Sequence, residues 1–161
     1  MTRQSVTASH QRRTGGAAVA VTVLLTAACG GEHRLSKPAY EQHVQAAYAP
    51  VRAAFRGTAN APSLKDLAAR VAAAQAALRT AADEVALLRP PKNAAGPNDD
   101  LVEALRAYAD DLDGLRSAAA EGDTRVVRRF ESGNRESVDR IERAAEELTA
   151  LGYRLGALAP G

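Results

Sequence analysis

The spacing of apolar residues in the middle of the chain limits its fold more than any other feature. From Ser63 to the Pro90-Pro91 pair they recur every three or four positions, at Leu64, Leu67, Val71, Ala74, Leu78, Ala81, Val85 and Leu88. This spacing places them on one face of an α-helix. Ser63, with Asp66 three residues later, is close to a capping box. The sequence therefore predicts an amphipathic helix that ends before Pro90.

Two segments on either side of this helix show the same spacing. The earlier one follows a cap at Ser36 and contains Pro50, which should bend or break the helix at about Ala49. Its apolar residues are Tyr40, Val44, Ala47, Tyr48, Val51 and Phe55. The later one should begin at the cap and acidic residues Asn98-Asp99-Asp100 and end at Gly122. Its apolar residues are Leu101, Leu105, Tyr108, Leu112 and Leu115.

A last helix is predicted from Asp123 or Thr124 to Gly152. Its apolar face comprises Val127, Phe130, Val138, Ile141, Ala145, Leu148 and Leu151. No stretch alternates with period two, so no strand is expected. Because short loops join antiparallel neighbours, residues 36–155 are predicted to form an all-α, up-down-up-down antiparallel four-helix bundle, with residues 156–161 as a tail. A three-helix core with a looser first helix is the alternative.

The N-terminal residues have the three parts of an export signal. Arg3, Arg12 and Arg13 precede an uncharged stretch over residues 15–28, which ends in small residues. A positive region, a short apolar region and a small-residue cleavage site are typical of a signal peptide. The apolar stretch is shorter than the roughly 20 residues of a membrane-spanning helix. Residues 1–28 are therefore expected to be removed.

Cys29 follows directly and is the only cysteine of the chain. The residues Leu25-Thr26-Ala27-Ala28-Cys29 resemble the lipobox of bacterial lipoproteins, with Thr26 in place of the usual larger aliphatic residue. The resemblance implies a lipid on Cys29 and a protein held at the extracytoplasmic face of the cell membrane. Residues 29–35 would be a short tether. Arg12-Arg13 leaves twin-arginine export open beside the general route.

Removal of the signal changes the charge balance. Three of the 21 Lys and Arg lie in residues 1–28 and none of the 19 Asp and Glu does, so the mature chain carries 18 basic and 19 acidic side chains, a formal charge of −1. A nucleic-acid partner would need a basic patch on the mature domain. No such partner is expected from the charge of the precursor.

The sequence contains no pattern typical of catalysis, a cofactor or a metal. Among the histidines, His10 lies in the signal, His33 in the tether and His43 alone on the first helix. Paired ligands at helical spacing are absent, and phosphate loops and nucleophile elbows are absent too. Catalytic residues, metal ligands and cofactors are therefore predicted to be none.

One irregularity remains in the last predicted helix. Ser132-Gly133-Asn134 places a glycine in its interior and Asn134 on its apolar face. A helix-interior glycine costs about 1 kcal/mol relative to alanine. One explanation for these residues is a kink or a close helix contact. The alternative is a notch for a ligand or partner, formed by Asn134 with Tyr108 across the core.

In the order of its helix ends, the chain resembles the small alanine-rich helical lipoproteins of high-GC actinobacteria. The residues that carry the likeness are Leu-Leu-Arg-Pro-Pro at 87–91, Gly122-Asp123 and Gly152-Tyr153. The resemblance implies fold and location but no chemistry. The expected function is a non-enzymatic interaction or envelope-structural lipoprotein, attached to the membrane through Cys29 and contacting an envelope protein. A small-ligand or solute-binding bundle is the alternative, and it would need a pocket of several hundred Å³.

Overall fold

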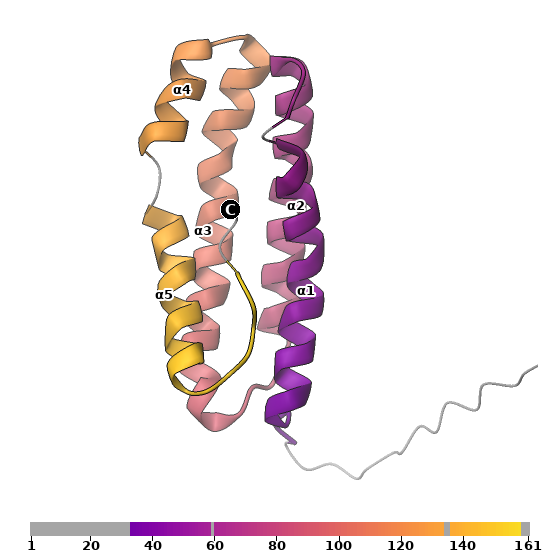
Figure 1. Ribbon diagram of the computed structural model, residues 1–161, viewed down its shortest axis with the longest axis vertical. Helices are drawn as coiled ribbons and strands as arrows, with labels where there is room; N and C mark the ends of the chain where they lie inside the picture. The colour runs from indigo at the N-terminus through magenta and orange to yellow at the C-terminus, as the bar shows by residue number, and fades with distance from the viewer. Residues whose placement is uncertain (1–32, 59, 134–135, 159–161) are drawn as a thin grey trace, which may run out of the picture. The chain divides into compact units, whose positions relative to one another are not determined.

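Helices account for most of the described residues in a computed structural model of the chain (Figure 1). The structure describes residues 33–58, 60–133 and 136–158, which belong to one unit, Glu32–Gly161. Within these residues the elements are α1 (Lys37–Thr58), α2 (Leu64–Ala86), the short 3₁₀ helix η1 (Lys92–Ala94), α3 (Ala95–Glu121), α4 (Thr124–Gly133) and α5 (Glu136–Ala150). No strand occurs in these ranges, so the all-α class is confirmed.

The helix ends mostly follow local chemistry. The Ser63 hydroxyl accepts a hydrogen bond from the Asp66 backbone N–H at 3.1 Å and so caps α2. Gly122 ends α3 at a φ of +79°, a left-handed conformation that glycine adopts without a Cβ penalty. At the start of α4 the Asp123 carboxylate accepts from the Val126 N–H at 3.2 Å. These three ends were predicted from the sequence.

Pro50 was predicted to bend or break the first helix, and the break was wrong. Helix α1 continues from Lys37 to Thr58 with Pro50 inside it. Proline removes one backbone donor from a helix interior, but Tyr48 and Val51, on either side of it, are 2% and 0% exposed. Burial of these two side chains holds both halves of α1 against the core. Pro50 itself is exposed.

The predicted start of the third helix at Asn98 was also wrong. Helix α3 begins at Ala95, directly after η1, and no side chain caps it. Pro97 is tolerated there because the first N–H groups of a helix have no intrahelical acceptor. Asn98 consequently lies inside the helix, 2% exposed, and serves a different role from the predicted cap.

Residues predicted to form one last helix are described as two, α4 and α5, which both contact α3. Asn134 lies between them in the sequence, outside the described residues. Cys29 and the whole predicted signal also lie outside the described residues. No helix in the described ranges has the length and apolarity needed to cross a membrane.

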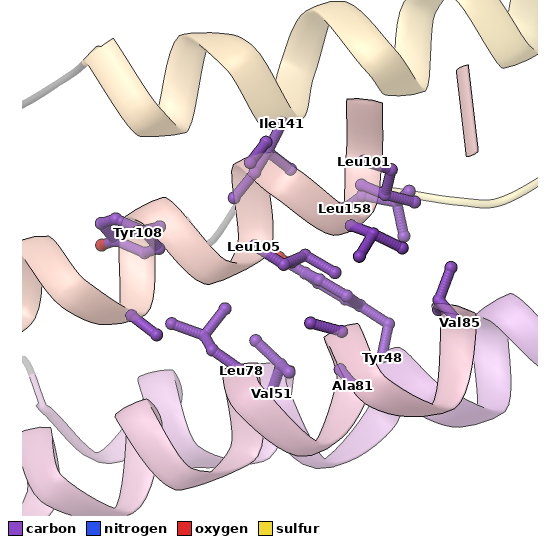
Figure 2. Packing of buried hydrophobic residues seen from close by; sticks show 14 of the residues in the cluster. Tyr48, Val51, Leu78, Ala81, Val85, Leu101, Leu105, Tyr108, Ile141 and Leu158 are labelled. Atoms are coloured by element: carbon purple, nitrogen blue, oxygen red, sulfur yellow. The ribbon is translucent and has the colours of Figure 1, made fainter. Parts of the chain in front are cut away.

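The core lies where α1, α2, α3 and α5 face one another. Figure 2 shows Tyr48 and Val51 of α1, Leu78 of α2, Leu105 of α3 and Ile141 of α5 pointing toward a common centre. Alanines close the spaces between the helices: Ala74, Ala81, Ala82, Ala104 and Ala109 are all fully buried. Small side chains let helix axes approach to the lower end of the 8–10 Å range.

A buried amide fixes α2 against α3. Gln75 of α2 is 3% exposed, and its Nε2 donates to the Ala109 carbonyl at 2.8 Å and to the Asp113 carboxylate at 2.9 Å. The hydrogen bond from Gln75, with a second from Arg116, holds the pKa of Asp113 below its usual value. Both acceptors belong to α3, so the contact specifies how the two helices align.

The last described residues belong to the packed body. After α5 the chain turns at Gly152, where φ is +84°, and runs back along the helices (Figure 1). Leu155 and Leu158 are 2% and 1% exposed. Residue 158 falls in the segment expected to be a tail, so the core extends beyond residue 155. Leu151, expected on the apolar face, is instead 40% exposed because α5 ends at Ala150.

Leu105→Ala tests this core. Leu105 is fully buried, so we expect the variant to lose about 2–5 kcal/mol of unfolding free energy in urea titrations. Leu87→Ala is the matched control, because Leu87 is 84% exposed and its truncation should change stability by less than about 0.5 kcal/mol. Equal losses in the two variants would contradict the described packing.

Candidate functional site

One end of the helical body combines several long-range polar contacts with a cavity. We call it the tether end and define it as residues 33–38, 86–97 and 149–156. It contains the start of α1, the connection from α2 through η1 to α3, and the chain that leaves α5 (Figure 1). These segments are distant in sequence, so contacts between them are tertiary.

The chain is attached to this end before α1 begins. The Leu35 N–H donates to the Arg89 carbonyl at 2.7 Å, and the Arg34 guanidinium donates to the Pro90 carbonyl at 3.1 Å. Leu35 also packs against the core. Arg34 and Leu35, expected in a free tether, therefore belong to the packed body.

A pair of tyrosines joins three further segments. The Tyr40 hydroxyl of α1 donates to Asn98 Oδ1 of α3 at 3.0 Å, and both side chains are buried. The Tyr153 ring meets the Tyr40 ring edge to face, with centroids 5.4 Å apart at 81°. The Tyr153 hydroxyl donates to Asn93 Oδ1 of η1 at 2.8 Å. Asn98 thus uses its amide oxygen to fix α1 against α3.

Helix α1 also holds the chain that follows α5. Glu41 is 8% exposed, and its carboxylate accepts from the Arg154 backbone N–H at 3.0 Å. The Gln45 amide donates to the Arg154 carbonyl. The Lys37 ammonium lies 5.1 Å from the centroid of the Tyr153 ring, within the range of a cation–π contact. Both the backbone N–H and the backbone carbonyl of Arg154 are therefore hydrogen-bonded to side chains of α1.

A half-open cavity of about 280 Å³ lies at the tether end. Its lining residues are Arg34, Ala86, Leu88, Arg89, Pro90, Ala95, Asn98 and Asp99. Two guanidinium groups and an amide can donate hydrogen bonds there, and one carboxylate can accept them. The volume is just below the 300–1,000 Å³ common for small-molecule sites.

A second cavity, of about 270 Å³, lies between α2 and α3 and is lined by charged residues alone. Arg79 pairs with Asp110 at 3.2 Å, and Arg106 pairs with Asp83 at 3.0 Å. All four side chains are at least half exposed. Exposed pairs of this kind contribute at most about 1 kcal/mol each. Their geometry indicates a solvated contact between two helices.

The predicted notch is described at one of its two residues. Tyr108 is 8% exposed and stacks on Phe55 of α1, with ring centroids 5.6 Å apart at 14°. Asn134 lies outside the described residues, so the pairing with Tyr108 stays a prediction. Neither of the two cavities above includes Tyr108.

No group of three or more His, Cys, Asp and Glu side chains in the described ranges could hold a metal ion. His43 is exposed on α1. Residues that sequence reasoning missed are Tyr40, Glu41 and Asn98 as a polar network. The helical spacing of apolar residues identifies Tyr40 only as a core residue. No local pattern pairs it with Asn98, which lies 58 positions away.

Comparisons of the chain with protein families, with curated proteins and with solved structures found no match.

Tyr40→Phe and Tyr48→Phe form a matched pair on α1. Tyr40→Phe leaves the buried Asn98 oxygen without its donor, and we expect a loss of about 1–3 kcal/mol in unfolding free energy. The buried Tyr48 hydroxyl has no hydrogen-bond partner in the described structure, so Tyr48→Phe should leave stability unchanged or raise it. Urea titrations measure both. An equal loss in the two variants would contradict the assigned contact.

Stability should fall in alkaline solution because of the buried phenols. Burial raises the pKa of Tyr108 to about 12 and raises the pKa values of Tyr40 and Tyr48 well above the ordinary 10.0. The unfolded chain ionises first, so stability contributed by the neutral phenols is full below pH 10 and is lost as pH rises from 10 through about 12. Denaturant titrations across this range measure the decline, and Tyr48→Phe should make it shallower. A flat profile would contradict this prediction.

Proposed function

We propose that the protein is a bacterial lipoprotein, attached to the membrane through a lipid on Cys29, whose helical body is a non-enzymatic interaction module at the extracytoplasmic face. The observation that carries the proposal is the sequence Leu25-Thr26-Ala27-Ala28-Cys29 at the end of a signal-like segment. Diacylglycerol transfer requires a thiol at the first mature position, and Cys29 is the only thiol of the chain.

The attachment of the chain to the tether end supports this proposal. Arg34 follows Cys29 by five residues, which span at most about 18 Å when extended. From Arg34 on, hydrogen bonds to the carbonyls of Arg89 and Pro90 hold the chain to the body. A lipid on Cys29 would therefore keep the tether end close to the bilayer.

We further propose that the body is an up-down-up-down antiparallel four-helix bundle in which α4 and α5 together take the place of the fourth helix. The support is that both pack on α3 and follow each other along it (Figure 1). The likeness to small alanine-rich actinobacterial lipoproteins is part of the same proposal, and it rests on the helix ends at residues 87–91, Gly122-Asp123 and Gly152-Tyr153.

A small-ligand-binding bundle is the second candidate, and one observation favours it. The cavity beside Arg34, Arg89 and Asn98 has room for a small polar molecule and offers it hydrogen-bond donors. Its volume suits a fragment-sized ligand and is small for a drug-sized one. We rank this function below an interaction module because the cavity is half open and its volume is just below the usual range of small-molecule sites.

The intact mass of the membrane-extracted protein tests the lipoprotein proposal. We expect a mass equal to residues 29–161 plus a diacylglyceryl group. Cys29→Ser removes the thiol and should give an unprocessed or lipid-free chain that no longer partitions as an anchored protein, since stable attachment needs more than one acyl chain. An unmodified mass from another cleavage site would refute the proposal, and so would full membrane retention of a cleaved Cys29→Ser chain.

A further inference from the structure

We propose that the cavity at the tether end is a binding site for a small zwitterion, a molecule in which a short apolar segment joins one carboxylate to one ammonium group. This inference deepens the small-ligand candidate given above and rests on it, but it does not depend on a lipid at Cys29. The features that carry it are unpaired charges of both signs, a buried amide with an unused donor, an apolar wall, and the contrast with the second cavity.

Charged side chains of both signs line this cavity without pairing with one another. Arg34 and Arg89 provide two guanidinium groups, and Asp99 provides one carboxylate. All three residues are exposed, and none of them forms an ion pair within the described ranges. A ligand that carries both charges can therefore satisfy both sides of the cavity together. A purely anionic ligand would bring a like charge to the Asp99 carboxylate.

The Arg34 guanidinium is held at the cavity by a backbone carbonyl. Its Nη1 donates to the Pro90 carbonyl at 3.1 Å, and the N–H of the next residue, Leu35, donates to the Arg89 carbonyl at 2.7 Å. A guanidinium group carries five N–H donors, so most of those of Arg34 stay available to a ligand. Because these bonds hold Arg34 beside the segment that carries Arg89, both guanidinium groups are available to the same carboxylate.

A buried amide adds a neutral donor to the same wall. Asn98 is 2% exposed and lines the cavity, and its Oδ1 accepts from the Tyr40 hydroxyl. Its Nδ2 has no acceptor among the described residues. In those residues the only fully buried side-chain N or O atom without a partner is the Tyr48 hydroxyl, so the Asn98 Nδ2 is not sealed in the core. A donor with so little contact with water gains from an acceptor on a ligand.

The Asp99 carboxylate lies close to this amide. Burial raises the pKa of Tyr40 above its usual value, and Tyr153 and Asp99 raise it further. The Asp99 carboxylate is therefore within electrostatic range of the hydroxyl that holds Asn98. A compact ligand is enough to reach the amide and the carboxylate together.

The rest of the lining is apolar and the space is small. These residues are Ala86, Leu88, Pro90 and Ala95. Their side chains offer no hydrogen bonds and suit the methylene groups that join the two charges of a zwitterion. The volume of about 280 Å³ is below the range of drug-sized ligands. Size and lining together favour a short amino acid over an inorganic anion, which has neither an apolar segment nor a cation.

The second cavity provides an internal comparison. It lies between α2 and α3, and its volume of about 270 Å³ is nearly the same. Arg79 pairs there with Asp110 at 3.2 Å. Arg106 pairs with Asp83 at 3.0 Å. Each of these charges already has a partner of opposite sign, so a ligand gains little from them. The cavity at the tether end differs because its charges do not pair.

Titration of the membrane-extracted protein in neutral detergent micelles tests the site. The probes are glycine, β-alanine and γ-aminobutyrate, which hold their two charges at increasing separation. The readout is the side-chain amide signal of Asn98 in proton–nitrogen NMR spectra. We expect a saturable shift with at least one probe, with a dissociation constant on the order of 1 mM for molecules of this size. The matched analogues that lack the ammonium or the carboxylate should bind at least about fivefold more weakly.

Variants at exposed residues test the role of each charge. Asp99→Asn should remove the preference for the zwitterion, so that the ratio of its affinity to that of the ammonium-free analogue falls from about five to about one. Arg89→Gln should weaken both ligands about fivefold. Arg106→Gln is the matched control in the second cavity, and it should leave both dissociation constants unchanged. Unchanged urea midpoints in the three variants would exclude loss of fold as the cause.

The possible failures are distinguishable. No saturable shift of the Asn98 amide with any of the three probes up to about 100 mM would overturn the zwitterion site and the small-ligand candidate together. Equal binding of the ammonium-free analogue, or an unchanged preference in Asp99→Asn, would leave a small-ligand site but contradict the zwitterion. An equal loss of affinity in Arg106→Gln would contradict the assignment to this cavity. The intact mass that tests the lipid on Cys29 is independent of these titrations.

Discussion

Burial of α3 along most of its length is the constraint on which the rest of the structure depends. Helix α2 packs on α3, and so do α4 and α5. Aromatic residues make up only 4% of the chain, so alanines such as Ala104, Ala109 and Ala118 fill much of this contact. Small side chains bring the helices close and leave little space between them. The two cavities described above therefore lie outside this contact, one where loops and helix ends meet and one among exposed charged side chains of α2 and α3.

Helix faces could be predicted from the sequence because periodicity is a local property of the chain. Val71, Leu105 and Leu112 are buried where their spacing placed them. Helix limits were less predictable when tertiary contacts opposed local preference. Pro50 weakens a helix locally, but burial of its neighbours outweighs one lost backbone donor. Asn98 is typical of a cap, yet its amide oxygen accepts a buried hydrogen bond from Tyr40, and α3 starts three residues earlier.

The candidate site was less accessible to sequence reasoning than the fold. Its contacts join Tyr40 with Asn98 and Tyr153 with Asn93, pairs about 60 positions apart that no local pattern connects. Leu151 shows a second reason why the sequence was insufficient. Its spacing from Leu148 would place it in the core if the helix continued, but α5 ends at Ala150. The same chain reversal at Gly152 exposes Leu151 and buries Tyr153. One helix end thus creates both the apolar surface and the aromatic contact.

The chemistry of the tether end bears on how an anchored module can keep a fixed orientation. A lipid on a free linker limits distance from the bilayer but leaves the body able to rotate. Restricting this rotation requires a body that is rigid close to the anchor. Hydrogen bonds from Arg34 and Leu35 to the residue 89–90 turn provide such rigidity, since they extend the packed body to within five residues of Cys29. The contact of Tyr40 with Asn98 and the binding of the Arg154 backbone by Glu41 join the other segments of this end into one unit.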